Sequence, residues 1–214
     1  MPQFLRILLG CYLFCAVTGF VSACSPPPIA SFGTMPETRG PGGGSVQGGY
    51  GFYYLERHLG AVHSAFGLTD AVDLNAGAWV MEDIYMGNGG AHFQVLRNPT
   101  FPISISGGLG LGAFNGSLAY GAYAGFTLGW RPARLFGFYQ GNRYQIALGE
   151  ETETTHYGHH VLGVQIDWTQ IFFTNIESGY YYYATADEGI VEHGPSIVFA
   201  SFGVRWGPPP DSAD

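Results

Sequence analysis

The chain has 214 residues, of which 46% are hydrophobic, 16% are aromatic and only 11% are charged. The charged fraction is less than half of the roughly 25% usual for a soluble domain, and the hydrophobic content excludes a disordered chain. The 34 glycines and 13 prolines show no Gly-X-Y period, which excludes collagen. Because glycines interrupt every apolar run after residue 23, a bundle of membrane-spanning helices is also excluded.

The first 23 residues have the features of an export signal. Arg6 supplies the positive start, residues 7–20 form an apolar core, and Val21-Ser22-Ala23 supplies the small residues that precede a cleavage site. We therefore predict that residues 1–23 are a lipoprotein signal peptide that is removed from the mature protein.

The next residue is Cys24, and Val21-Ser22-Ala23-Cys24 resembles the lipobox of bacterial lipoproteins. This resemblance implies that the Cys24 thiol is acylated and becomes the new N-terminus, which makes Cys24 the predicted lipidation site. Cys11 and Cys15 lie in the removed segment, so no disulfide can form within the mature chain. The alternative is ordinary secretion with a chance cysteine at this position.

The mature chain is strongly acidic. Removal of Arg6 leaves 8 − 1 = 7 basic residues, all arginine, against 16 acidic residues, a formal charge near −9. A chain of this charge repels polyanions, so we expect no nucleic-acid partner.

Composition divides the mature chain into three parts. Residues 24–48 hold the predicted acylated cysteine and a Pro/Gly-rich tether, a composition typical of flexible linkers. Residues 49–207 are the predicted β-barrel domain, and residues 208–214 form a predicted disordered tail.

Apolar and small or polar residues alternate with a period of two from residue 49 onward, which predicts strands and not helices. The clearest alternation occurs in Val72–Val80, Ile103–Ala113, Ala122–Trp130, Leu162–Trp168 and Val198–Trp206. Further candidate strands are Tyr50–Glu56, Gly60–Leu68, Ala91–Arg97, Leu135–Leu148 and Ile171–Tyr183. The ten candidate strands suit an antiparallel meander. A count of eight strands remains open if some of these segments merge or lie outside the barrel.

Turn-forming pairs and triplets separate these segments. The predicted turns are Thr69-Asp70, Asn88-Gly89-Gly90, Asn98-Pro99, Asn115-Gly116, Arg131-Pro132 and Gly141-Asn142.

Strands of this kind fit an outer-membrane barrel, whose strands are apolar outside and polar or small inside and carry aromatic girdles. The sequence predicts an all-β fold, a closed antiparallel up-and-down β-barrel of about 8–10 strands. The lipid bilayer is then its main partner. The alternative is a lipid-anchored soluble barrel in the periplasm that turns its apolar face inward and binds a small apolar ligand there.

Two segments resemble small bacterial outer-membrane β-barrels. Ala65–Leu74 is similar to their strand, Gly-x-Thr-Asp turn and returning strand, and Val198–Trp206 is similar to their closing strand that ends on an aromatic residue. The resemblance implies insertion by the outer-membrane assembly machinery, and the lipobox implies the lipoprotein-processing machinery. The chain departs from the pattern by continuing past Trp206 and by carrying a lipobox.

Candidate chemical sites are few. His156, His159 and His160 are close in sequence, but adjacent strand residues point to opposite faces, so we expect no metal site. His63-Ser64 and Glu192-His193 with Ser196 are candidate catalytic groups, but adjacency in sequence does not establish the required geometry, and we predict no catalytic site. No nucleotide or redox motif is present in the sequence, and we expect no cofactor.

The lumen of such a narrow barrel is filled by side chains. Asp167 and Arg205 are expected to pair inside it, and inward glycines are expected to leave room for aromatic side chains of neighbouring strands. The sequence therefore favours an outer-membrane lipoprotein with a structural or surface-interaction role and no turnover, with a lipid-modifying enzyme as the minority hypothesis.

Overall fold

The structure is a computed structural model that describes residues 35–53, 57–81, 84–114, 117–149, 152–185, 189–192 and 197–207. The predicted signal peptide, Cys24 and the predicted tail 208–214 lie outside these residues. Among the residues described, no helix is long and apolar enough to cross a membrane.

The chain forms strands throughout, and their bounds are β1 Gly44–Tyr53, β2 Arg57–Thr69, β3 Val72–Met81, β4 Ile84–Leu96, β5 Ile103–Phe114, β6 Ser117–Ala133, β7 Phe136–Gly149, β8 Thr152–Asp167, β9 Phe172–Thr185, β10 Gly189–Glu192 and β11 Ile197–Trp206. Each pairs antiparallel with its neighbours.

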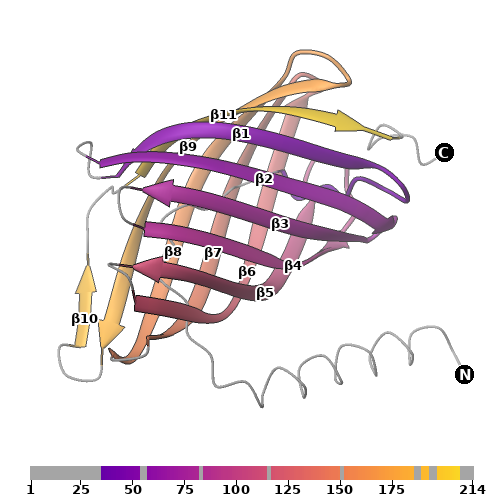
Figure 1. Cartoon of the computed structure of the whole chain (residues 1–214). Coiled ribbons are helices and arrows are strands. Elements are labelled where there is room, and N and C mark those ends of the chain that lie inside the picture. The colour runs from indigo at the N-terminus through magenta and orange to yellow at the C-terminus, as the bar shows by residue number, and fades with distance from the viewer. Residues whose placement is uncertain are drawn as a thin grey trace, which may run out of the picture.

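Ten of these strands close into a barrel (Figure 1). Consecutive strands pair from β1 to β9, and β11 pairs with both β9 and β1, so the ring has no open edge. β10 pairs only with the last residues of β9, beyond the part of β9 that pairs with β11. The predicted all-β, closed antiparallel up-and-down barrel is confirmed, with ten strands in the ring.

Both ends of the described chain lie at one end of the barrel, because Gly44 of β1 pairs with Trp206 of β11. We call this the terminal end, and the opposite end the far end (Figure 1). The turns at residues 70–71 and 134–135 also lie at the terminal end, since β2 and β6 run toward it.

The alternation predicted from the sequence is confirmed, with the apolar face outward. On β3, Asp73 and Trp79 are only 3% and 6% exposed, whereas Leu74 and Val80 are 47% and 42% exposed. Large apolar residues are likewise exposed on the other barrel strands, including Val62, Ile105, Leu109, Phe126, Leu162, Ile176 and Phe202. The soluble alternative required the opposite orientation, and this part of it is wrong.

Aromatic side chains pack over glycines on the inner wall, as expected. Tyr139 of β7 lies over Gly163 of β8, where an added Cβ would come within 2.2 Å of the ring. Phe173 of β9 covers Gly203 of β11 in the same way, also at 2.2 Å. These glycines make room for rings that fill the narrow lumen.

Three predicted turns are wrong. Asn88-Gly89-Gly90 lies inside β4, Gly141-Asn142 lies inside β7, and Arg131-Pro132 lies near the end of β6 at a register shift. Gly90 faces the lumen, where the Tyr123 hydroxyl would lie 2.5 Å from an added Cβ. Packing inside the barrel, and not turn geometry, therefore requires glycine there. Thr69-Asp70 and Asn98-Pro99 lie at or between strand ends, as predicted.

The barrel also begins earlier than the predicted boundary at residue 49. β1 starts at Gly44, and Met35–Arg39, which belong to the predicted tether, are buried. The physical reason is that this segment carries side chains that match partners on the inner wall, which composition alone does not reveal.

Candidate functional site

The segment at residues 35–43 lies within the terminal end of the barrel, and we call it the lumen plug. Met35 is fully buried and packs with Tyr139 and Val161 of the inner wall. The carbonyl of Pro36 accepts a hydrogen bond from His92 Nε2 of β4 at 3.0 Å. The plug therefore contacts both β4 and the β7–β8 wall.

The plug is hydrogen-bonded to wall side chains and to the turn after β2. The Thr38 amide donates to Gln94 Oε1 at 3.1 Å, and the Thr38 hydroxyl donates to the Asp70 carbonyl at 2.7 Å. The Arg39 amide donates to both carboxylate oxygens of Asp73, at 3.0 Å each. Such bonds fix the position of the plug, because leaving these buried groups unpaired costs about 1–3 kcal/mol each.

A chain of ion pairs joins the plug to the wall. Arg131 Nε contacts Glu37 Oε1 at 2.9 Å, and Arg131 Nη1 contacts Asp167 Oδ2 at 2.6 Å. Asp167 also contacts Arg205 Nη2 at 2.5 Å, which confirms the expected pair. Gln165 Nε2 donates to Asp167 Oδ1 at 2.8 Å. Asp167 thus accepts from three donors on three strands.

The plug region has balanced charge. Its ionic side chains are three acids and three arginines, namely Glu37, Asp73, Asp167, Arg39, Arg131 and Arg205. Both Arg39 and Arg205 also lie over the Phe173 ring, 5.9 and 5.4 Å from its centroid. Burial, followed by the Arg205 charge, lowers the pKa of Arg39, and the carboxylates of Asp73 and Glu37 oppose this shift.

The far end of the lumen is apolar. Six buried side chains from four strands pack there, namely Leu59, Trp79, Met81, Ile84, Met86 and Phe199. Ala61 and Tyr157 pack against this cluster. The lumen is therefore narrowed by a charged plug at one end and by an apolar cluster at the other.

Because the plug closes one end and the apolar cluster narrows the other, we expect the purified barrel to hold no open pore. The measurement is the current through a planar lipid bilayer that contains the folded protein. At about 100 mV, on the order of the voltage across a cell membrane, we expect no steady ohmic current. A stable open conductance from the unmodified protein would contradict this description of the lumen.

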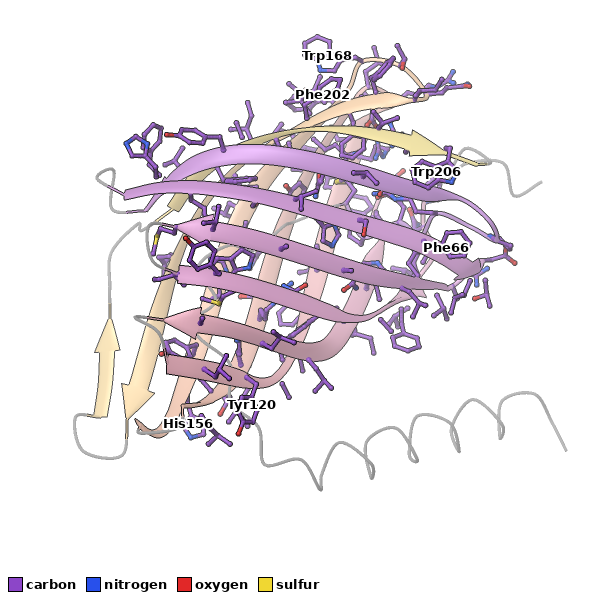
Figure 2. The ribbon with its side chains drawn as sticks, in the orientation of Figure 1. Phe66, Tyr120, His156, Trp168, Phe202 and Trp206 are labelled. Atoms are coloured by element: carbon purple, nitrogen blue, oxygen red, sulfur yellow. The ribbon has the colours of Figure 1, made fainter. Side chains whose placement is uncertain are left out.

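Aromatic residues flank the outer apolar surface at both ends (Figure 2). Phe66, Trp168, Phe202 and Trp206 lie toward the terminal end, and Tyr120 lies toward the far end. On β6, Tyr120 and Trp130 are separated by ten residues, which spans about 26 Å along the axis at about 3.4 Å per residue and a tilt of about 40°. This matches the roughly 25 Å apolar band of outer-membrane barrels.

Histidines join the far-end aromatic belt. Tyr144 stacks on His156, with its hydroxyl 2.5 Å from Nδ1, and Tyr50 is bonded to His58. His160 lies 5.2 Å from Tyr180, measured between ring centroids. These rings combine an apolar body with a polar tip, which suits the boundary between hydrocarbon and headgroups.

The three neighbouring histidines of β8 do not converge. His159 is buried on the lumen side, whereas His156 and His160 pack with the outward tyrosines named above. No group of three or more potential metal ligands occurs in the described ranges.

The first candidate catalytic pair, His63-Ser64, is also separated. Ser64 faces outward and its hydroxyl bonds the Ala76 carbonyl at 3.3 Å, whereas His63, its neighbour, faces the lumen. His193 and Ser196 lie outside the residues described, as does Cys24.

Sequence reasoning missed Glu37, Arg39 and Arg131. The available signal was the presence of two opposite charges, Glu37 and Arg39, within an otherwise uncharged Pro/Gly-rich segment. Charges of opposite sign are unexpected in a flexible tether. They could have indicated that this segment pairs with charged residues inside the barrel.

No family model matches this chain, and no curated protein matches it. Among solved structures, it is similar to the KdgM porin at 12% identity, covering 77% of this chain and 99% of that chain with a TM-score of 0.43. It is also similar to the COG4313 outer membrane channel from Pseudomonas putida F1, at 8% identity, 85% and 99% coverage and a TM-score of 0.48. The outer membrane protease OmpT from Escherichia coli matches at 10% identity, 77% and 93% coverage and a TM-score of 0.39.

Proposed function

We propose that this protein is an outer-membrane β-barrel lipoprotein with a structural or surface-interaction role and no turnover. The single observation that carries the proposal is the outward apolar face of a closed ten-strand ring, bounded by aromatic residues at both ends. Closure satisfies every ladder hydrogen bond without water, which a strand protein needs in hydrocarbon.

The filled lumen supports a role without transport. The ion pairs of the plug close one end and the apolar cluster narrows the other, so a solute would have to displace these side chains to pass through the lumen. The candidate catalytic pair His63-Ser64 is split between the two faces, and this favours a role without turnover.

Acylated Cys24 supplies a second anchor in this proposal. Met35 follows Cys24 by eleven positions, and an extended chain of eleven steps reaches at most about 36–40 Å. This reach is long enough for the acyl chains on Cys24 to enter the bilayer while Met35 stays in the plug. The assembly and lipoprotein-processing machineries are the partners that this route implies.

Charge placed on the outer wall tests whether that wall meets lipid. Ile176 faces outward, 49% exposed, midway between Phe172 and Tyr180 on β9. We expect Ile176→Arg to lower the unfolding free energy in lipid vesicles by about 2–4 kcal/mol, as for arginine at a bilayer midplane. Urea titration followed by tryptophan fluorescence measures this change.

The matched control is Leu135→Arg. Leu135 is 57% exposed in the turn between β6 and β7, at the terminal end, where the cost of arginine is expected to be about 0–1 kcal/mol. A barrel whose outer wall meets water would tolerate both substitutions equally, and that result would refute the proposed function.

A further inference from the structure

One lumen arginine differs from the others. Arg131 and Arg205 contact carboxylates directly, and the charge of Arg39 interacts with Asp73 and Glu37. Arg143 of β7 has no carboxylate within ion-pair distance among the residues that the structure describes. Its guanidinium instead lies over the Tyr123 ring, 4.5 Å from the centroid.

The wall beneath this arginine is closely packed. Tyr123 lies across Gly108 and Gly90 of the two preceding strands, and its hydroxyl donates to Asn75 Oδ1 at 3.1 Å. The ring is therefore fixed on one face by the wall and covered on the other by Arg143. The cation is held in place without being neutralised.

A buried histidine without hydrogen-bond partners among the described residues lies next to Arg143 on the neighbouring strand. His159 of β8 is the register partner of Arg143 and is only 3% exposed, and neither of its ring nitrogens has a hydrogen-bond partner in the described chain. Because a neutral imidazole carries one N–H, at least one buried donor lacks an acceptor. Buried donors are normally satisfied, so this one indicates an absent acceptor.

A second histidine faces the same space. His63 lies inward on β2, and the charge of Arg143 acts on it across the lumen. Small residues surround these groups: Gly77, Gly125 and Gly141 face inward and retain partial exposure. A Cβ added at Gly141 would meet nothing closer than 3.9 Å. Space therefore remains beside Gly141, whereas an added Cβ at Gly125 or Gly77 would lie 2.5 Å from the Asn142 carbonyl oxygen or 3.1 Å from Asn88 Oδ1.

We propose that Arg143, His159 and His63 form a binding site for one small oxyanion inside the barrel. A buried cation without a carboxylate at ion-pair distance attracts an anion more strongly in a medium of low effective dielectric than in water. The planar guanidinium donates two parallel hydrogen bonds, which match the oxygens of an oxyanion better than a spherical halide. This inference is independent of the proposed function.

The plug closes one end of the lumen and the apolar cluster narrows the other, so the anion enters most readily while the barrel folds. The mature chain is therefore refolded in detergent with inorganic phosphate or, at equal ionic strength, with chloride, and then exchanged into anion-depleted buffer. We expect about one phosphate retained per wild-type barrel. Arg143→Gln is expected to retain at least tenfold less, whereas Arg134→Gln, at an exposed turn residue, should match the wild type.

A second measurement needs no arginine variant. With ¹⁵N-labelled histidine in the wild-type barrel, phosphate should shift the side-chain resonances of His159 and His63, assigned by single His→Gln substitutions, and leave His58 and His156 unchanged. Absence of retained phosphate, equal retention by Arg143→Gln, or shifts confined to the outward histidines would each overturn the proposal.

Discussion

Replacing Gly163 by alanine is expected to destabilise the barrel by about 1–3 kcal/mol, the range for overpacking a filled interior. The added Cβ would lie 2.2 Å from Cζ of Tyr139 and 2.5 Å from its hydroxyl oxygen. The ring cannot move freely, because its hydroxyl donates to Glu177 Oε1 at 2.6 Å and its face packs near Met35 and Val161. Urea unfolding in vesicles measures the loss.

Gly141→Ala is the matched control for this substitution. Gly141 is also an inward-facing strand glycine, on β7, but the nearest atom to its added Cβ is Thr127 Oγ1 at 3.9 Å. Alanine at this position should leave the unfolding free energy unchanged or slightly raised, because alanine lowers the conformational entropy of the unfolded chain. Equal losses at the two positions would show that the ring over Gly163 is not tightly packed.

Asp167→Asn is expected to have the larger effect, a loss of about 3–5 kcal/mol, because it breaks a buried charge network by removing one member. The substitution keeps the side-chain shape but leaves Arg131 with Glu37 alone and Arg205 without a carboxylate within ion-pair distance in the described residues. The charge of Arg205 is then buried without a paired carboxylate among these residues. The same urea titration measures the change.

Asp70→Asn provides the control, since Asp70 is an exposed aspartate in the turn after β2 and only its backbone carbonyl binds the plug. We expect this variant to unfold within about 0.5 kcal/mol of the wild type. If Asp167→Asn were equally mild, the ion pairs at the terminal end would contribute little to holding the plug.

The sequence predicted the barrel well because alternation is a local signal. Each side chain's direction follows from its position on the strand, so Leu74 and Asp73 could be assigned to opposite faces before the structure was known. The resulting assignment of outward apolar residues is confirmed. Turn signals were less reliable, because a glycine such as Gly90 is required by a distant ring, Tyr123, and not by its own neighbours.

The lumen was predicted only in part. The pairing of Asp167 with Arg205 followed from two inward charges in a narrow space, and it is confirmed. The partners of Glu37 and Arg39 could not be predicted, because they lie more than 30 residues away in sequence and the segment itself has the composition of a linker. Long-range matching of this kind is set by the closed ring and not by local propensity.

The most direct test of the membrane barrel uses a Cys24→Ala variant with a functional export signal, followed by a carbonate wash of isolated outer membranes. Our account predicts that the variant stays in the membrane and migrates differently on a gel before and after heating, because the barrel itself is the principal anchor. Release of a soluble periplasmic protein would contradict the account, since acylation would then be the only attachment to the membrane.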